Sequence, residues 1–195
     1  MVPSKELLKL SQTKPMVSIE NVVASATVDQ ELDLKDIKKK FPDVEYNPKQ
    51  FPGAVFKLKS PKTATLLFRT GNMVCTGAKS EDNAKKAVNT VVEKLRGKKI
   101  KIKNNAKVLI ENIVTAVNLG GRIHLEEAAR TLPRSMYEPE QFPGLVHRMI
   151  DPKSVTLLFA SGKLVCTGCK STSEVFRAIH QIHTTLEEKH LMFYD

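Results

Sequence analysis

The stretch VSIENVVASATV, residues 17–28, alternates between two sets of positions in the way that a β-strand does. One face of the strand would carry Val17, Ile19, Asn21 and Val23, and the other would carry Val22, Ala24 and Ala26. Turn signals at Ser60-Pro61 and Thr70-Gly71-Asn72 separate the apolar runs that follow. We therefore expect a short helix over residues 32–41 and an antiparallel meander over residues 54–59, 63–68 and 73–78.

Apolar residues at helical spacing run through SEDNAKKAVNTVVEKL, residues 80–95, which predicts an amphipathic helix. Ser80 is a good N-cap, and Glu81 and Asp82 suit the positive end of the helix dipole. One such helix covers only one face of a sheet.

The strands of the meander are nevertheless apolar on both faces. Leu67 and Cys75 alternate with Leu66, Phe68 and Val74. We therefore expect an apolar sheet face that no helix covers, and an exposed apolar surface of that size is typical of a binding site.

The chain is internally duplicated. Residues 17–95, the first copy, align without a gap with residues 108–186, the second copy, and identity clusters in IEN, QFPG, TLLF and VCTG. The period is too long for a solenoid repeat and indicates duplication of a half-domain. We expect two similar halves, together with an N-terminal extension (1–16), a basic connector (96–107) and a C-terminal tail (187–195).

Composition narrows the class of protein. Lys and Arg number 31 against 21 Asp and Glu, a formal net charge of +10, which favours a polyanionic partner but also suits a merely soluble basic surface. Lys5, Glu6 and Lys9 interrupt any apolar run at the N-terminus, so we expect neither a signal peptide nor a membrane anchor, and an intracellular protein. The 3 cysteines, an odd number, suggest reduced thiols.

A zinc-like pattern is present, but we reject it. Cys166 and Cys169, followed by His180 and His183, imitate a zinc-finger ligand set with short spacing. The first copy keeps only Cys75 at the matching positions, so we expect no metal, no redox dithiol and no cofactor. No nucleophile and base recur in both copies, and there is no phosphate-cradling glycine loop, so we do not expect an enzyme.

The motif QFPG places a phenylalanine in a polar turn twice, at Phe51 and Phe142. A large aromatic ring in such a turn needs an apolar partner, either in the protein core or in a bound molecule. From the residues alone, core packing and an exposed binding role are equally open for Phe68 and Phe159, which lie in apolar strands, whereas core packing is less favoured for Phe51 and Phe142.

The motifs ENVV/ENIV, YNPKQFPG/YEPEQFPG, TLLF, TGNMVCTGAK and SGKLVCTGCK resemble those of the TATA-binding protein family, general transcription initiation factors, in their short archaeal form. The resemblance covers about residues 17–186. It implies an α+β fold, a saddle of ten antiparallel strands with a concave DNA-facing side and four helices on the convex side. It also implies binding to an A·T-rich promoter box in the minor groove, DNA bending and assembly of a preinitiation complex for RNA polymerase.

The resemblance assigns a role to each group of residues. The wedges between base pairs would be Phe51, Phe68, Phe142 and Phe159, with Pro52 and Pro143 stiffening the turns that present the first wedge of each copy. The base edges would be read by Asn21, Asn112, Val23, Val114, Leu66, Leu157, Val74, Val165, Thr76 and Thr167. The phosphates would be bound by Lys57 and Arg148, and more weakly by Lys62, Lys153, Lys163, Lys79 and Lys170.

The two copies differ in charge. YNPKQ in the first copy becomes YEPEQ in the second, and KDIKKK becomes EEAART. We expect a basic partner to dock on the acidic end and to set the polarity of the protein on DNA. In the family this partner is transcription factor B, and Glu138, Glu140 and Gln141 would contact it, although eukaryotic members have Leu at the place of Gln141.

Three questions stay open at the level of sequence. A DNA-bending enzyme and a sheet that stacks single-stranded RNA are alternative functions, although no catalytic acid or polar pocket is visible. The free protein could form a homodimer through its apolar face. The expected location is the cytoplasm with the nucleoid if the source is archaeal, and the nucleus if it is eukaryotic.

Overall fold

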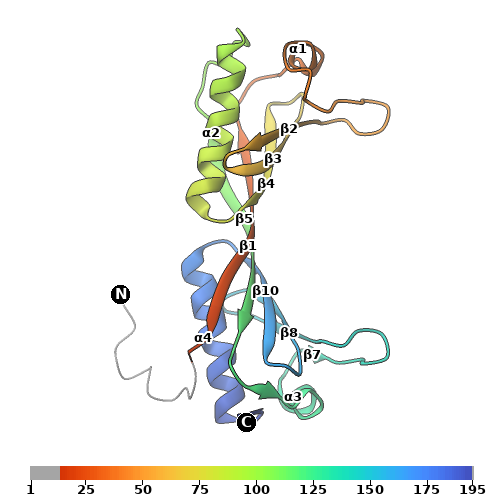
Figure 1. The fold of residues 1–195 in the computed structure, drawn as a ribbon, viewed down its shortest axis with the longest axis vertical. Coiled ribbons are helices and arrows are strands. Elements are labelled where there is room, and N and C mark those ends of the chain that lie inside the picture. Colours follow the sequence, from red (N-terminus) through yellow and green to blue (C-terminus); the bar gives the residue numbers. More distant parts are fainter. Residues whose placement is uncertain (1–13, 195) are drawn as a thin grey trace. The chain divides into compact units, whose positions relative to one another are not determined.

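The computed structural model describes residues 14–194, which form two compact units. The first-copy unit comprises Glu20–Asn112, and the second-copy unit comprises residues 14–19 and 113–194. Strands β1 (Met16–Thr27) and β5 (Lys107–Asn118) each contribute residues to both units. Figure 1 labels the helices and strands of both units.

The first-copy unit follows the predicted order of elements. After β1 come α1 (Leu34–Lys40), β2 (Ala54–Lys59), β3 (Lys62–Leu67), β4 (Asn72–Ala78) and α2 (Glu81–Gly97). The meander is antiparallel: Leu66 pairs with Val55 of β2 and Val74 of β4. The predicted helices, strands and turns of this half are confirmed.

The second-copy unit repeats this order and adds short strands. After β5 come β6 (Arg122–Ile123), α3 (Leu125–Thr131), β7 (Ser135–Met136), β8 (Leu145–Met149), β9 (Ser154–Leu158), β10 (Lys163–Cys169), α4 (Thr172–Glu188) and β11 (Met192–Phe193). Strands β6 and β11 pair with each other in a small separate sheet. Neither was expected from the sequence.

Among the described residues, nine strands are hydrogen-bonded in the order β2-β3-β4-β1-β5-β10-β9-β8-β7, and four helices are present. The predicted α+β class, a large antiparallel sheet with four helices, is confirmed. The resemblance to the family implied a tenth strand. At its position in the first copy there is only an isolated bridge between Glu45 and Val55, whereas β7 in the second copy pairs at two positions.

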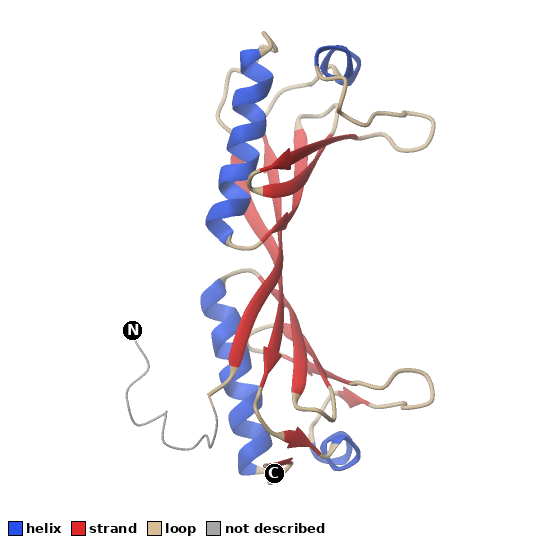
Figure 2. Cartoon of the chain, viewed as in Figure 1, coloured by secondary structure: helices blue, strands red, loops and turns tan. Residues whose placement is uncertain are grey.

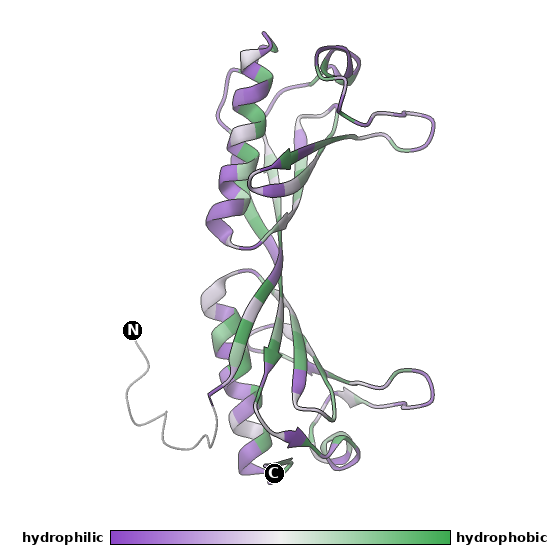
Figure 3. Cartoon of the chain, in the orientation of Figure 1, coloured by the Kyte–Doolittle hydropathy of each residue, from purple (hydrophilic) through white to green (hydrophobic). Residues whose placement is uncertain are grey.

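One long helix covers one face of the sheet in each unit, α2 in the first and α4 in the second (Figure 2). Ser80 and Ser171 cap these helices, each accepting a hydrogen bond from the backbone N–H three residues later. The apolar side of each helix faces the sheet (Figure 3). The residues of this stripe are buried: Ala84, Ala87, Val88, Val91, Val92 and Leu95 in α2, and Val175, Ala178, Ile179, Ile182 and Leu186 in α4.

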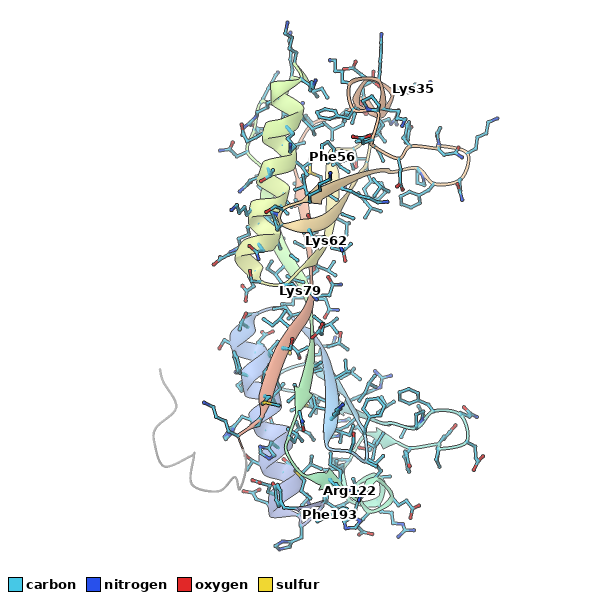
Figure 4. The ribbon with its side chains drawn as sticks, in the orientation of Figure 1. Lys35, Phe56, Lys62, Lys79, Arg122 and Phe193 are labelled. Atoms are coloured by element: carbon cyan, nitrogen blue, oxygen red, sulfur yellow. The ribbon has the colours of Figure 1, made fainter. Side chains whose placement is uncertain are left out.

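The segments that follow α2 and α4 contact the residues that follow β1 and β5. Gln30 receives a hydrogen bond from the Lys103 N–H at 2.9 Å and donates one to the Lys101 carbonyl at 2.6 Å. Residues 101–103 correspond to 192–194 in the second copy, where β11 pairs with β6. There Phe193 lies 5.5 Å from the Arg122 guanidinium (Figure 4).

Candidate nucleic-acid interface

The sheet face opposite the long helices carries the residues expected to read base edges. Leu67 and Cys75, on the covered face, are fully buried, whereas Leu66 and Val74 beside them are only half-buried. The other members of the predicted set, Asn21, Asn112, Val23, Val114, Leu157, Val165, Thr76 and Thr167, are also half-buried. The alternation inferred from the sequence is therefore present in both units.

Strand register groups these residues in rows. Val55, Leu66, Val74 and Ser25 lie opposite one another on successive strands of the first-copy unit. The second-copy unit has the equivalent row, Val146, Leu157, Val165 and Ala116. Sequence reasoning missed Val55 and Val146 as members of this surface, although both copies have Val at this position.

Two phenylalanine rings pack together at the same place in each unit. The centroids of Phe51 and Phe68 are 5.9 Å apart with an interplanar angle of 67°. Phe142 and Phe159 show 5.9 Å and 68°. Neither pair lies beneath a helix: Phe51 is 40% exposed and Phe142 is 39% exposed. The partner of the ring in each QFPG turn is thus the second predicted wedge, and both rings remain accessible.

The turn that presents the first ring is closed by backbone hydrogen bonds. The Phe51 N–H donates to the Asn47 carbonyl at 3.0 Å, and the Phe142 N–H donates to the Glu138 carbonyl at 2.9 Å. An open groove whose lining includes Pro52, Phe68 and Val74 borders the first ring pair. The turn therefore holds an aromatic ring at the edge of the apolar face.

The glycine of QFPG makes room for the ring pair, a role that sequence reasoning missed. A Cβ on Gly53 would lie 2.7 Å from Cε1 of Phe51 and 3.1 Å from Cε1 of Phe68. A Cβ on Gly144 would meet Phe142 at 2.7 Å and Phe159 at 3.0 Å. The sequence signal for this role was the glycine at the same position of both copies, but a glycine there is equally typical of an ordinary turn.

Asn21, on this face, forms hydrogen bonds to two residues of β4. Its Oδ1 accepts a hydrogen bond from the Gly77 N–H at 2.7 Å, and its Nδ2 lies 3.2 Å from Oγ1 of Thr76. The sequence predicted that Asn21 and Thr76 share a role, and the fold places them in contact.

Comparison with known proteins identifies the family. The family model described as "Transcription factor TFIID (or TATA-binding protein, TBP)" matches residues 16–97 and 107–189. A TATA-box-binding protein of Pyrodictium occultum is 47% identical over 188 residues, covering 96% of this chain and 94% of that protein. A TATA-box-binding protein of Methanothermobacter thermautotrophicus is 46% identical, covering 90% and 97%. The chain belongs to the TATA-binding protein family.

A solved structure supports the same assignment. The TATA-binding protein of Methanococcus jannaschii superposes with a TM-score of 0.81 at 41% identity, covering 88% of this chain and 98% of that chain. The resemblance inferred from the motifs is confirmed. Members of the TATA-binding protein family are DNA-binding transcription factors rather than enzymes. No helix among residues 14–194 is long and apolar enough to span a membrane.

The predicted phosphate-binding side chains differ in their surroundings. Lys57 forms an ion pair with Glu45, and Lys79 Nζ donates to the Glu20 carbonyl at 2.7 Å. Arg148 is exposed and has no acidic partner among the described residues. The remaining members of the set, Lys62, Lys153, Lys163 and Lys170, are exposed. Lys62 and Lys79 are labelled in Figure 4.

The acidic turn of the second copy is solvent-exposed, as a docking site requires. Glu138, Glu140 and Gln141 are all exposed, and neither carboxylate has a basic partner among the residues that the structure describes. The first copy has Asn47 and Lys49 at the positions of the two glutamates. This turn therefore presents uncompensated negative charge next to the Phe142 ring.

The cysteines lie beneath the covered face and not at the interface. Cys75, Cys166 and Cys169 are free and fully buried. Burial raises the pKa of the Cys166 thiol to about 12, which disfavours the reactive thiolate. Among residues 14–194, no group of three His, Cys, Asp or Glu side chains could hold a metal ion.

Proposed function

We propose that this protein is a general transcription factor that binds an A·T-rich promoter box in the DNA minor groove and kinks it with four phenylalanine wedges. The observation that supports this most strongly is the accessible Phe pair at the edge of an uncovered apolar sheet face, repeated with the same geometry in both units. The named relatives are TATA-box-binding proteins, which agrees with this function.

The energetics of the wedges are consistent with the proposal. Because 40% of Phe51 remains exposed, about 80 Å² of ring is available to a base, worth about 2 kcal/mol. Phe51 and Phe142 together then contribute about 4 kcal/mol, and the half-buried Phe68 and Phe159 contribute less, against a bending cost of up to roughly 10 kcal/mol. The apolar rows and the phosphate contacts supply the remainder. A single wedge would be insufficient.

The chemistry of the face favours A·T pairs. A·T pairs present only acceptors in the minor groove, whereas G·C pairs add the exocyclic amine of guanine. Asn21 and Thr76 can donate to those acceptors, and the apolar row through Leu66 and Val74 offers no acceptor to an amine. G·C pairs are therefore disfavoured.

The proposal includes a partner that sets polarity. A basic surface of transcription factor B would dock on the turn carrying Glu138, Glu140 and Gln141, and the bound complex would then nucleate assembly with RNA polymerase. The unpaired exposed carboxylates of this turn support this choice over the first-copy turn. Because the named relatives are archaeal, we infer that the protein acts at the nucleoid of an archaeal cell.

Two binding experiments test the function. Affinity is measured for an A·T-rich duplex, a G·C-rich duplex and the separated single strands, and the bend is measured by ligation of phased sites. We expect preference for the A·T duplex and a phase-dependent bend. Preference for single strands would instead favour the RNA-stacking alternative, and an unbent duplex would exclude the wedge mechanism.

A third experiment tests the partner. Charge reversal by Glu138→Lys and Glu140→Lys should abolish the ternary complex with transcription factor B and leave binary DNA binding intact. The matched control is Lys49→Glu in the first copy, which should leave the ternary complex unchanged. Survival of the ternary complex after the double reversal would refute the docking assignment.

A further inference from the structure

Strand β4 contains an irregularity beside Asn21. Gly77 has φ +95°, a conformation that L-residues rarely adopt, and the pairing of β4 with β1 shifts register between Val22 and Ala24. The equivalent Gly168 in β10 has φ +99°, and a register shift occurs there as well. The same bulge is therefore present in both copies.

The bulge directs a backbone donor at the side chain of Asn21. The Gly77 N–H donates to Oδ1 at 2.7 Å instead of to a neighbouring strand. Because an amide nitrogen cannot accept this bond, the interaction fixes which end of the amide is the oxygen. Nδ2 must then occupy the other position of the amide, where it donates one of its two hydrogens to Oγ1 of Thr76, with 3.2 Å between the nitrogen and the oxygen.

The second hydrogen of Nδ2 has no acceptor among the residues that the structure describes. Asn21 belongs to the uncovered face, since Val22 and Ala24 on either side of Val23 are fully buried on the opposite face. The amide therefore presents a donor of fixed direction in the region where the proposed function brings the base edges.

We propose that Gly77 is a positioning residue for sequence recognition: its bulged N–H orients the Asn21 amide so that the NH2 group donates to one minor-groove acceptor. Gly168 occupies the equivalent position in the second copy. This inference rests on the proposed DNA-binding function and adds a specificity device to it. A freely rotating amide could turn its oxygen toward the amine of guanine, whereas the fixed amide cannot.

The test scans acceptor atoms one at a time. In an A·T-rich duplex each adenine is replaced in turn by 3-deazaadenine and each thymine by 2-thiothymine, which removes or weakens the N3 or O2 acceptor. For the unmodified protein we expect a loss of about tenfold in affinity at the base facing Asn21. Asn21→Ala and Gly77→Ala should each remove this position-specific penalty.

Gly77→Ala acts through the backbone. The alanine is disfavoured at φ +95°, and its Cβ would lie 3.3 Å from the Lys62 carbonyl oxygen. The matched control is Gly97→Ala, because no atom lies within 4 Å of a Cβ at that position, and it should keep the full penalty. A merely structural role for Gly77 would lower affinity equally on every duplex and leave the penalty in place, which would overturn the proposal.

A measurement on the unmodified protein covers the case in which Gly77→Ala does not fold. A scalar coupling across the hydrogen bond from the Gly77 nitrogen to the Asn21 side-chain carbonyl carbon is expected in free protein by NMR. Its absence, with DNA binding intact, would refute the positioning role while leaving the proposed function standing. If the unmodified protein shows no preference for the A·T-rich duplex, the proposed function itself is refuted.

Discussion

The QFPG turns of the two copies share their aromatic geometry but differ in charge. Ring separations are identical at 5.9 Å and interplanar angles differ by one degree, 67° against 68°. Around them Asn47 and Lys49 are replaced by Glu138 and Glu140. Under the proposed function, the ring in each turn would insert between bases, so the same ring geometry would be required in both halves. Under the same proposal, the charged positions of the turn would contact the partner instead of the bases, so their charge can differ between the copies.

The largest expected effect is removal of a wedge ring. Phe51→Ala and Phe142→Ala should each cost about 2 kcal/mol of DNA affinity, roughly 30-fold, because a stacked base loses its aromatic partner. Fluorescence anisotropy with an A·T-rich duplex measures both. Because the pairs have equal geometry, the two losses should agree within about threefold. A larger difference between the two affinity losses would show that the two turns do not contribute equally to DNA binding.

A smaller effect is expected from crowding the ring pair. Gly53→Ala and Gly144→Ala each place a methyl group 2.7 Å from a wedge ring, so the ring must move. We expect a loss of about 1 kcal/mol in DNA affinity, with little change in melting temperature because the displaced ring is partly exposed. Calorimetry and anisotropy on the same variants separate the two effects. A drop in melting temperature of many degrees would show that the glycine supports the fold instead.

The predicted phosphate-binding residues Lys57 and Arg148 should contribute unequally to the salt dependence of DNA binding. Arg148→Gln should reduce the slope of log affinity against log salt by about 0.9, since one phosphate contact is lost. Lys57→Gln should reduce it less, because Lys57 is already paired with Glu45. Glu45→Gln should release Lys57 and strengthen binding slightly at low salt, by about 0.5 kcal/mol. Equal slopes for the two cation variants would contradict this asymmetry.

The smallest expected effect concerns acid stability, where the copies also differ. His147 and His183 are buried in the second-copy unit, and Phe56 and Val92 take their places in the first. Burial lowers the pKa of both histidines. For His147, a hydrogen bond from the ring to the backbone carbonyl of Pro133 opposes the shift in pKa, and the charge of Arg134 adds to it. For His183, Glu187 opposes the shift and His180 adds to it.

A lowered pKa makes the folded state resist protonation. As the pH falls through the unfolded value of about 6.5, the unfolded chain binds more protons, so stability is present above that value and decreases below it. The variant His147→Phe with His183→Val should therefore lose less melting temperature than the unmodified protein between neutral pH and about pH 5. An unchanged pH profile would show that other groups control acid unfolding.

Much of the fold follows from patterns that are local in sequence. The alternation around Leu67 and Cys75 predicted both sheet faces correctly, and Ser80 and Ser171 predicted the starts of the long helices. The duplication supplied an internal check on each element. The segments after the helices were missed because Lys101–Lys103 is highly basic and shows no strand pattern, so it read as a connector, and nothing local reveals that Gln30 binds it.

The candidate site divides in the same way. The four predicted wedges, the predicted base-edge residues and the acidic turn were named from motifs, and the fold places the four phenylalanines in two pairs. The Glu45 partner of Lys57 and the contacts that Gly53 and Gly77 make lay beyond the sequence reading. Each depends on atoms that the fold brings together from different strands or turns.

The sequence by itself determined the spacing of apolar positions in each helix and strand, the duplication, and the types of residue on the uncovered face. All of these depend on spacing along the chain. Only the tertiary structure decided which rings touch, which lysines are neutralised and which way the Asn21 amide faces. Those outcomes depend on register shifts and close approaches of a few ångströms, and a one-residue change in strand pairing would alter them without changing the sequence pattern.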